Sequence, residues 1–294
     1  MRATLPGGLE LAYEEFGDRD APALVLIMGL GTQMIAWPEA LCEALAAAGL
    51  RVIRFDNRDV GLSTRFDGVP APGPVKLQFM KLLRRRVEVP YTLDDMAADA
   101  VGLLDALGIE SAHVAGASMG GMIAQLVALK HPARVRSLCS IMSTTGNASL
   151  PGPAFRVTRH MFLSRPPAGD RERYVQHAVK TLRLIDGPGF PTTEAESRAM
   201  VERHLARAHY PEGFRRHLAA ILVAADRSEA LTALATPTLV VHGTHDPLIP
   251  AEAGRHTAEQ VPGARLELIE GMGHIMPDSL CPTLASLMAG HALA

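Results

Sequence analysis

Short apolar runs alternate with amphipathic stretches along most of this chain. Five runs are mainly apolar and are bounded by glycine, proline or charged residues: 23–28, 51–56, 112–116, 238–243 and 266–269. Apolar character over four to six successive residues is typical of a strand that is buried on both faces. Strands that alternate with helices predict an α/β protein with a mostly parallel central sheet flanked by helices.

The stretches between these runs have the spacing and the end signals of helices. Residues 37–49 end on a glycine, and residues 92–107 begin with Thr92 as an N-cap followed by two aspartates. Helices are also expected over 119–130 and from about 281 to 291. Each predicted strand up to residue 116 is therefore followed by a helix that can cover the sheet.

The alternation stops after Ser143. Residues 146–231 contain no convincing strand, and they are interrupted by the proline- and glycine-rich sequences PGP, RPPAGD and DGPGFP. We interpret 146–231 as a helical cap inserted into a catalytic core that is built from 1–145 and 232–294.

Composition narrows the classes of function. Of 294 residues, 48% are hydrophobic and 20% are charged, and the net charge of −2 argues against a nucleic acid as partner. No apolar stretch is long enough for a stable membrane insertion, and no signal peptide is visible. Three widely spaced cysteines without a CxxC pattern predict neither a disulfide framework nor a metal site. We expect a cytoplasmic protein.

A basic amphipathic segment covers residues 76–86. It could form a helix that lies on a membrane surface, but one short stretch gives only marginal membrane affinity. We interpret it as a surface helix that packs on the cap or on a partner subunit, which makes a homodimer one of the expected assemblies.

The strongest chemical signal is the sequence GASMG at residues 116–120, which matches G-x-S-x-G with a strand before it and a helix after it. Gly116 and Gly120 leave room for a sharp turn between the two elements. Such a turn presents the hydroxyl of Ser118 above the sheet, where it can act as a nucleophile. The sequence therefore predicts Ser118 as the catalytic serine.

A serine hydroxyl needs a base to act as a nucleophile at neutral pH. His274 is the favoured candidate because its glycine-rich loop follows the last strand, and catalytic groups collect beyond the carboxyl ends of parallel strands. His245 is the nearest competitor. His113 lies inside a strand, where a packed core residue is expected.

The base in turn needs a carboxylate to orient it. Asp246 follows the strand at 238–243 and precedes His274, which gives the chain order Ser, Asp, His. Asp226 is a weaker alternative. Asp56 and Asp59 also follow a strand, and we interpret them as parts of a hydrogen-bonded structural turn.

The negative oxygen of a tetrahedral intermediate needs hydrogen-bond donors, and two backbone N–H groups are expected to supply them. One belongs to Met119, directly after the nucleophile. The other is assigned to Leu30 in the loop after the first buried strand, where Gly29 and Gly31 allow a close approach to the substrate.

These residues resemble the α/β-hydrolase superfamily across essentially the whole chain. Several segments are similar to the aclacinomycin methylesterase branch of bacterial esterases: 16–18, 28–29, 37–38, 54–63, 97–101 and 271–274. The resemblance implies a catalytic triad of Ser118, Asp246 and His274 under a helical cap. The loop sequence Gly29-Leu30-Gly31 departs from the family's Gly-Gly.

The leading hypothesis is a serine carboxylesterase that hydrolyses an ester of a small to medium, largely apolar molecule through an acyl-enzyme, without a metal or organic cofactor. The same triad also suits a lactonase, a carbon–carbon bond hydrolase or a cofactor-free perhydrolase, because a fold does not fix a reaction. A non-catalytic ligand-binding protein is the alternative from another class.

Overall fold

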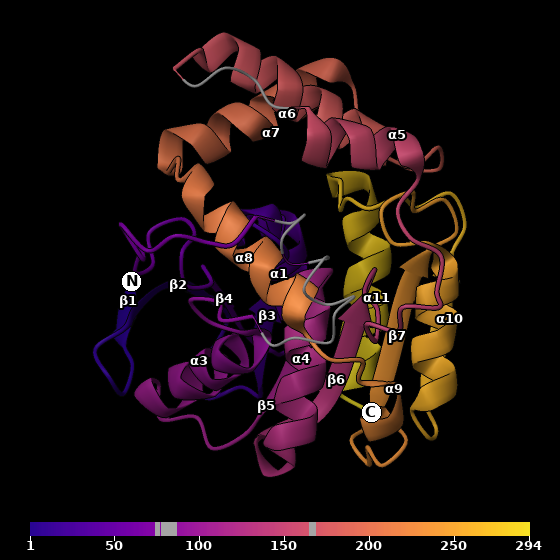
Figure 1. Ribbon diagram of the computed structural model, residues 1–294. Helices are drawn as coiled ribbons and strands as arrows, with labels where there is room; N and C mark the ends of the chain where they lie inside the picture. Colours follow the sequence, from indigo (N-terminus) through magenta and orange to yellow (C-terminus); the bar gives the residue numbers. More distant parts are fainter. Residues whose placement is uncertain (74–76, 78–86, 165–168) are drawn as a thin grey trace.

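The structure is a computed structural model that describes residues 1–73, 77, 87–164 and 169–294 (Figure 1). Apart from Leu77, the interpretation of residues 76–86 as a surface helix lies outside the described residues. The described part consists of a central sheet, helices on both of its faces, and further helices above one end of the sheet.

An eight-stranded sheet forms the centre, in the order β1-β2-β4-β3-β5-β6-β7-β8. The pairs β1/β2 and β2/β4 are antiparallel and the other five pairs are parallel. The strands span β1 (Arg2–Thr4), β2 (Glu10–Phe16), β3 (Ala23–Ile27), β4 (Arg51–Phe55), β5 (Ala112–Ala117), β6 (Val135–Ile141), β7 (Thr238–Gly243) and β8 (Arg265–Ile269). The predicted mostly parallel sheet is confirmed. The strands β1, β2 and β6 are additions that the sequence pattern did not indicate.

Helices cover both faces of the sheet. Alternate residues of β3 point to opposite sides: Leu24 and Leu26 belong to one apolar cluster, and Val25 and Ile27 to the other. The first cluster is completed by α1 (Glu39–Ala47) and α11 (Cys281–Ala292), and the second by α3 (Leu93–Ala106) and α4 (Met119–Lys130). The helix α10 (Ala251–Gln260) packs on β7. The expected N-cap Thr92 begins α3 with a capping box.

All three cysteines are buried in the apolar cluster that α1 and α11 cover. They are free thiols.

Between β6 and β7 every regular element among the described residues is a helix. These elements are α5 (Phe155–Thr158), η3 (Arg159–Leu163), α6 (Arg171–Ile185), α7 (Glu194–Arg207), α8 (Pro211–Val223) and α9 (Ser228–Leu231). In Figure 1, α5, α6 and α7 lie above the end of the sheet to which β6 and β7 point, and α8 descends from them toward the core. The short helix α9 packs instead against α4 and α10. We use "upper helices" for α5 to α8.

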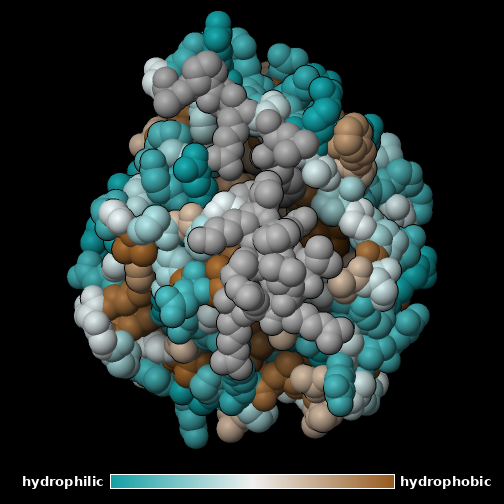
Figure 2. All heavy atoms as spheres, viewed as in Figure 1, coloured by the Kyte–Doolittle hydropathy of each residue, from teal (hydrophilic) through white to brown (hydrophobic). Residues whose placement is uncertain are grey.

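The surface over the upper helices is more hydrophilic than the surface over the core. On the face shown in Figure 2, the surface over α6 and α7 is mostly hydrophilic, while apolar residues show at scattered places over the core. Within the described residues, no helix combines the length and the hydrophobicity that are needed to span a bilayer. The remaining short helices are η1 (Met34–Ala36), η2 (Pro132–Arg134) and η4 (Asp278–Leu280).

Candidate active site

Ser118 occupies a strained turn between β5 and α4. Its φ of 58° and ψ of −121° lie in a region that few side chains adopt. The turn is possible because a Cβ on Gly116 would overlap the Gly120 carbonyl, and a Cβ on Gly120 would overlap the Ile27 carbonyl. The structure thus places Gly116, Ser118 and Gly120 as the sequence predicted for a nucleophile elbow.

Two hydrogen bonds join Ser118 to His274 and His274 to Asp246. The Ser118 Oγ lies 3.0 Å from His274 Nε2, and His274 Nδ1 lies 2.6 Å from Asp246 Oδ2. The imidazole and the carboxylate are both buried, whereas the serine is partly exposed. The three predicted residues therefore meet at the carboxyl ends of β5, β7 and β8, within proton-transfer distance.

The surroundings of Asp246 fix which nitrogen of His274 carries the proton. Asp246 Oδ1 accepts hydrogen bonds from the backbone N–H groups of Leu248 and Ile249, each at 2.9 Å, which leaves Oδ2 for the imidazole. A carboxylate can only accept, so Nδ1 of His274 donates to it. The Nε2 lone pair therefore faces the Ser118 hydroxyl and can take its proton.

A second histidine, His242, lies behind the same carboxylate, with its Nε2 3.6 Å from Asp246 Oδ2. Burial lowers the pKa of His242, although the neighbouring Asp246 opposes this. Its Nε2 donates to the Ile249 carbonyl at 2.8 Å. The neutral ring adds no charge that would compete with His274 for Asp246.

The alternatives from the sequence lie elsewhere. His245 is exposed and pairs with Thr244 Oγ1, and Asp226 is exposed and accepts from Ser228. His113 is buried against Ser137 and burial lowers its pKa to about 4, which fits the expected core residue. Among the described residues there is no group of three or more histidine, cysteine or acidic side chains that could hold a metal ion.

The loop after β3 lies directly against the nucleophile. A Cβ built on Gly29 would stand 3.1 Å from Ser118 Cβ and 3.6 Å from its Oγ. Within the described part of the chain, neither the N–H of Leu30 nor that of Met119 has a hydrogen-bond acceptor. Two N–H groups are thus available beside the hydroxyl, as an oxyanion hole requires.

The upper helices contact the loop that carries His274. The His274 N–H donates to the Ile185 carbonyl at 2.7 Å, and the Gly189 N–H donates to the Gly271 carbonyl at 2.9 Å. A Cβ on Gly273 would stand only 2.5 Å from the Ile185 carbonyl oxygen. Sequence reasoning treated the segment DGPGFP as a break between helices and missed that its glycines allow this backbone contact.

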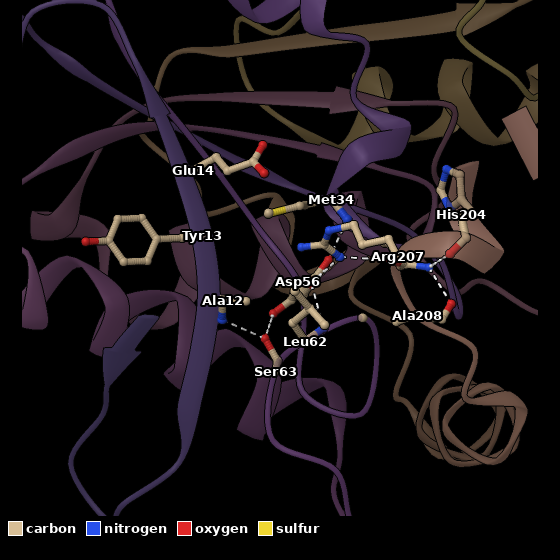
Figure 3. Close-up of polar contacts among 12 residues, drawn as sticks. Ala12, Tyr13, Glu14, Met34, Asp56, Leu62, Ser63, His204, Arg207 and Ala208 are labelled. Atoms are coloured by element: carbon tan, nitrogen blue, oxygen red, sulfur yellow. Dashed lines mark hydrogen bonds and ion pairs between the residues drawn. The ribbon is translucent and has the colours of Figure 1, made fainter. Parts of the chain in front are cut away.

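An ion pair also joins α7 to the core (Figure 3). Arg207 Nη1 lies 2.7 Å from Asp56 Oδ2, and the same nitrogen donates to Gln33 Oε1 at 2.8 Å. Asp56 further accepts from the N–H groups of Met34 and Leu62. Burial raises the pKa of Asp56, and these donors and Arg207 oppose the rise. The interpretation of Asp56 as part of a structural turn is confirmed.

A second ion pair attaches α8. Arg216 pairs with Asp59, with Nη2 2.9 Å from Oδ1, and both side chains are buried. Arg216 and His217 lie three and four positions after Gly213, on the buried face of the helix. Sequence reasoning missed both residues. Polar side chains at the core-facing positions of an amphipathic helix are the signal that could have found them.

Comparison with known proteins agrees with this geometry. A family model described as the alpha/beta hydrolase fold matches residues 22–278. The chain belongs to the α/β-hydrolase family. The resemblance noted in the sequence is thereby confirmed.

Two relatives of this α/β hydrolase are rhodomycin D methylesterases, DauP from Streptomyces sp. (strain C5) and DnrP from Streptomyces peucetius. Each is 32% identical over an alignment of 302 residues, gaps included, and the alignment covers 96% of this chain and 94% of the relative. The structure of the meta-cleavage product hydrolase CumD from Pseudomonas fluorescens IP01 superposes with a TM-score of 0.76 at 19% identity, over 99% of this chain and 96% of that one. At that identity the likeness to CumD concerns the fold alone.

Proposed function

We propose that this α/β hydrolase is a serine carboxylesterase that cleaves its substrate through an acyl-enzyme on Ser118. The hydrogen-bond chain from Ser118 Oγ through His274 to Asp246, with distances of 3.0 and 2.6 Å, is the observation that supports this most strongly. The names of the two methylesterase relatives support the same class of reaction, since a methylesterase hydrolyses a carboxylic ester.

In the proposed reaction, His274 Nε2 takes the proton of Ser118 as its oxygen attacks the ester carbonyl. Asp246 stabilises the imidazolium that forms. The carbonyl oxygen becomes negative, and the N–H groups of Leu30 and Met119 donate to it. The leaving alcohol receives the proton from His274. Water then loses a proton to the same imidazole and attacks the acyl-enzyme, which releases the acid.

We further propose that α5 to α8 act as a cap over the site and favour a small to medium, largely apolar ester. A buried apolar cluster of Val157, Ile185 and Ile275, with Leu248 packed against it, supports this. Ile275 directly follows His274 in the chain, so apolar side chains from the upper helices lie next to the proposed base.

Three expectations from the sequence stay predictions: the cap boundaries at 146 and 231, the cytoplasmic location and the homodimer.

Rapid mixing with p-nitrophenyl butyrate tests the proposal. We expect a burst of p-nitrophenol that approaches one equivalent per chain when deacylation is the slower step. The Ser118→Ala variant should lose both the burst and the steady-state turnover. Ser111→Ala, at the other end of β5, is the matched control and should keep both. Unchanged turnover in Ser118→Ala would refute the proposal.

A substrate panel then tests the class of ester. Methyl esters of apolar acids are the first series to measure, because the relatives are methylesterases. Lactones and vinylogous diketones belong in the same panel, since lactone opening and carbon–carbon cleavage use the same geometry. Higher kcat/KM for either of these than for every open-chain ester would replace the esterase proposal.

A further inference from the structure

A single buried histidine of α8 connects two loops of the core. His217 is fully buried, its Nδ1 lies 3.1 Å from the Gly31 nitrogen, and its Nε2 lies 2.7 Å from the Arg58 carbonyl oxygen. The carbonyl can only accept, so Nε2 carries the proton, and the Gly31 N–H can only donate, so Nδ1 is bare. Both hydrogen bonds exist together only when the ring is neutral.

The environment of the ring favours that neutral form. Burial lowers the pKa of His217 to about 4, and the hydrogen bond to the Arg58 carbonyl and the nearby Asp59 only partly oppose this. At neutral pH the Nδ1 lone pair is therefore available to the Gly31 N–H.

The Gly31 N–H belongs to the loop that faces the nucleophile. Gly29 lies against Ser118, and Leu30, whose N–H is the proposed oxyanion donor, is joined to Gly31 by one peptide plane. Holding the N–H of that plane restricts rotation of the backbone about Leu30. The loop turns here, with a Gly31 φ of 62°. Thr32 Oγ1 donates to the Leu30 carbonyl at the other end of the same plane at 3.0 Å. Loss of the acceptor for the Gly31 N–H leaves the plane held at that carbonyl alone, and the glycine permits it to tilt.

We propose that His217 is a positioning residue of the oxyanion hole, which aims the Leu30 N–H at the developing negative oxygen by accepting a hydrogen bond from Gly31. This inference rests on the proposed esterase function. It assigns to α8 a part in the chemistry and not only in covering the substrate.

His217 is not needed merely to attach α8 to the core. The same helix is held by the buried pair of Arg216 with Asp59, and Gly213 lies against the Asp59 backbone. These contacts with Asp59 leave the Gly31 N–H without an acceptor, which His217 supplies. If His217 positions the oxyanion hole, turnover depends mainly on Nδ1, which accepts from Gly31. If His217 is purely structural, turnover depends on both ring nitrogens only through the stability of the fold.

Two substitutions separate the two nitrogens. In His217→Asn the amide oxygen takes the place of Nδ1 and can still accept from Gly31. In His217→Gln the amide nitrogen takes the place of Nε2 and can still donate to the Arg58 carbonyl, but the acceptor for Gly31 is lost. His217→Met removes both hydrogen bonds at a similar side-chain size. Arg215→Ala, on the exposed side of α8, is the matched control.

We expect His217→Gln and His217→Met to lower kcat for p-nitrophenyl butyrate by about 10- to 100-fold, with KM changed by less than about 3-fold, because an oxyanion donor acts mainly in the transition state. His217→Asn should keep kcat within about 5-fold of the wild type. The inhibition constant of a trifluoromethyl ketone, whose adduct carries an oxyanion, should rise in the same proportion as kcat/KM falls.

Melting temperatures and circular dichroism of all variants accompany these assays. Equal kcat losses in His217→Asn and His217→Gln, or losses that follow the melting temperatures, would overturn the proposal. If His217→Gln does not fold, His217→Met serves in its place, and wild-type kcat in that variant would also overturn the proposal. Failure of the esterase function itself looks different, because the wild type would then show no turnover that depends on Ser118.

Discussion

Replacing Gly187 by alanine is expected to slow the reaction without altering any proposed catalytic residue. Gly187 lies in the segment after α6 that packs on the loop carrying His274. An added Cβ would stand 2.6 Å from the Met272 carbonyl carbon and would overlap the Gly271 oxygen and the Gly273 nitrogen. Ordinary van der Waals contact begins at 3.4 Å. The two backbones must therefore separate by at least about 0.8 Å to relieve the carbonyl-carbon contact, and by more to relieve the two closer overlaps.

That separation should move the base. The His274 N–H is hydrogen-bonded to the carbonyl of Ile185, two residues before Gly187. A shift of the loop therefore also moves the imidazole relative to Ser118. Its hydrogen bond to Ser118 measures 3.0 Å and weakens steeply with distance. Misplacement by about 1 Å can cost about 100-fold in rate, so we expect kcat to fall by about 30- to 100-fold. Overpacking should also cost about 1–3 kcal/mol in the free energy of unfolding.

The assay is steady-state hydrolysis of p-nitrophenyl butyrate at 25 °C, with circular dichroism to show that the variant is folded. Gly152→Ala is the matched control, because it lies in the connection before α5 and a Cβ there has no neighbour within 4 Å. Wild-type kcat in Gly187→Ala, or an equal loss in Gly152→Ala, would refute the reasoning that the upper helices place the imidazole.

Three further predictions concern charge and protonation. Asp246→Asn should lower kcat by about 10³- to 10⁴-fold in the same assay. Two backbone N–H groups hold the amide oxygen and turn the NH₂ toward His274, which imposes the wrong tautomer on the imidazole. A loss below 10-fold would contradict this. Arg216→Met should lower the free energy of unfolding, measured in urea, by about 3–5 kcal/mol, because Asp59 stays buried and charged without its partner. Adding Asp59→Asn should restore part of the lost stability, and no recovery would count against a charge effect. The pKa of His217 is lowered to about 4 from 6.5, so its contribution to stability is present above pH 6.5 and is lost as the pH falls toward 4. The unfolding free energy should fall over this range by on the order of 3 kcal/mol more in the wild type than in His217→Asn, and parallel pH profiles would contradict it.

The parallel part of the sheet other than β6, and the elements that carry the chemistry, were readable from the sequence. Buried parallel strands are continuous apolar runs, and the elbow at Ser118 has a local signature in its two glycines. The missed strand β2 reads differently because it carries charges that are paired in the folded protein. In β2, Glu14 is bonded to Arg54 and Glu15 to Arg51 on the neighbouring strand β4.

The contacts between the upper helices and the catalytic loops could not be predicted in the same way. His217 and Gly31 are 186 positions apart, and Arg207 and Asp56 are 151 positions apart. No local periodicity or spacing links such residues. What the sequence does contain is the placement of Arg216 and His217 on the otherwise apolar, inward face of an amphipathic helix. That placement indicates buried partners but does not identify them.

Covalent labelling is the most direct test of Ser118 as the nucleophile and of His274 as the base that activates it. We expect a fluorophosphonate to add once per chain. The label should map by mass spectrometry to the peptide containing Ser118, and activity should disappear in step with labelling. His274→Ala should label far more slowly. Full labelling at another residue, or retained esterase activity in a chain that is fully labelled at Ser118, would show that Ser118 is not the nucleophile.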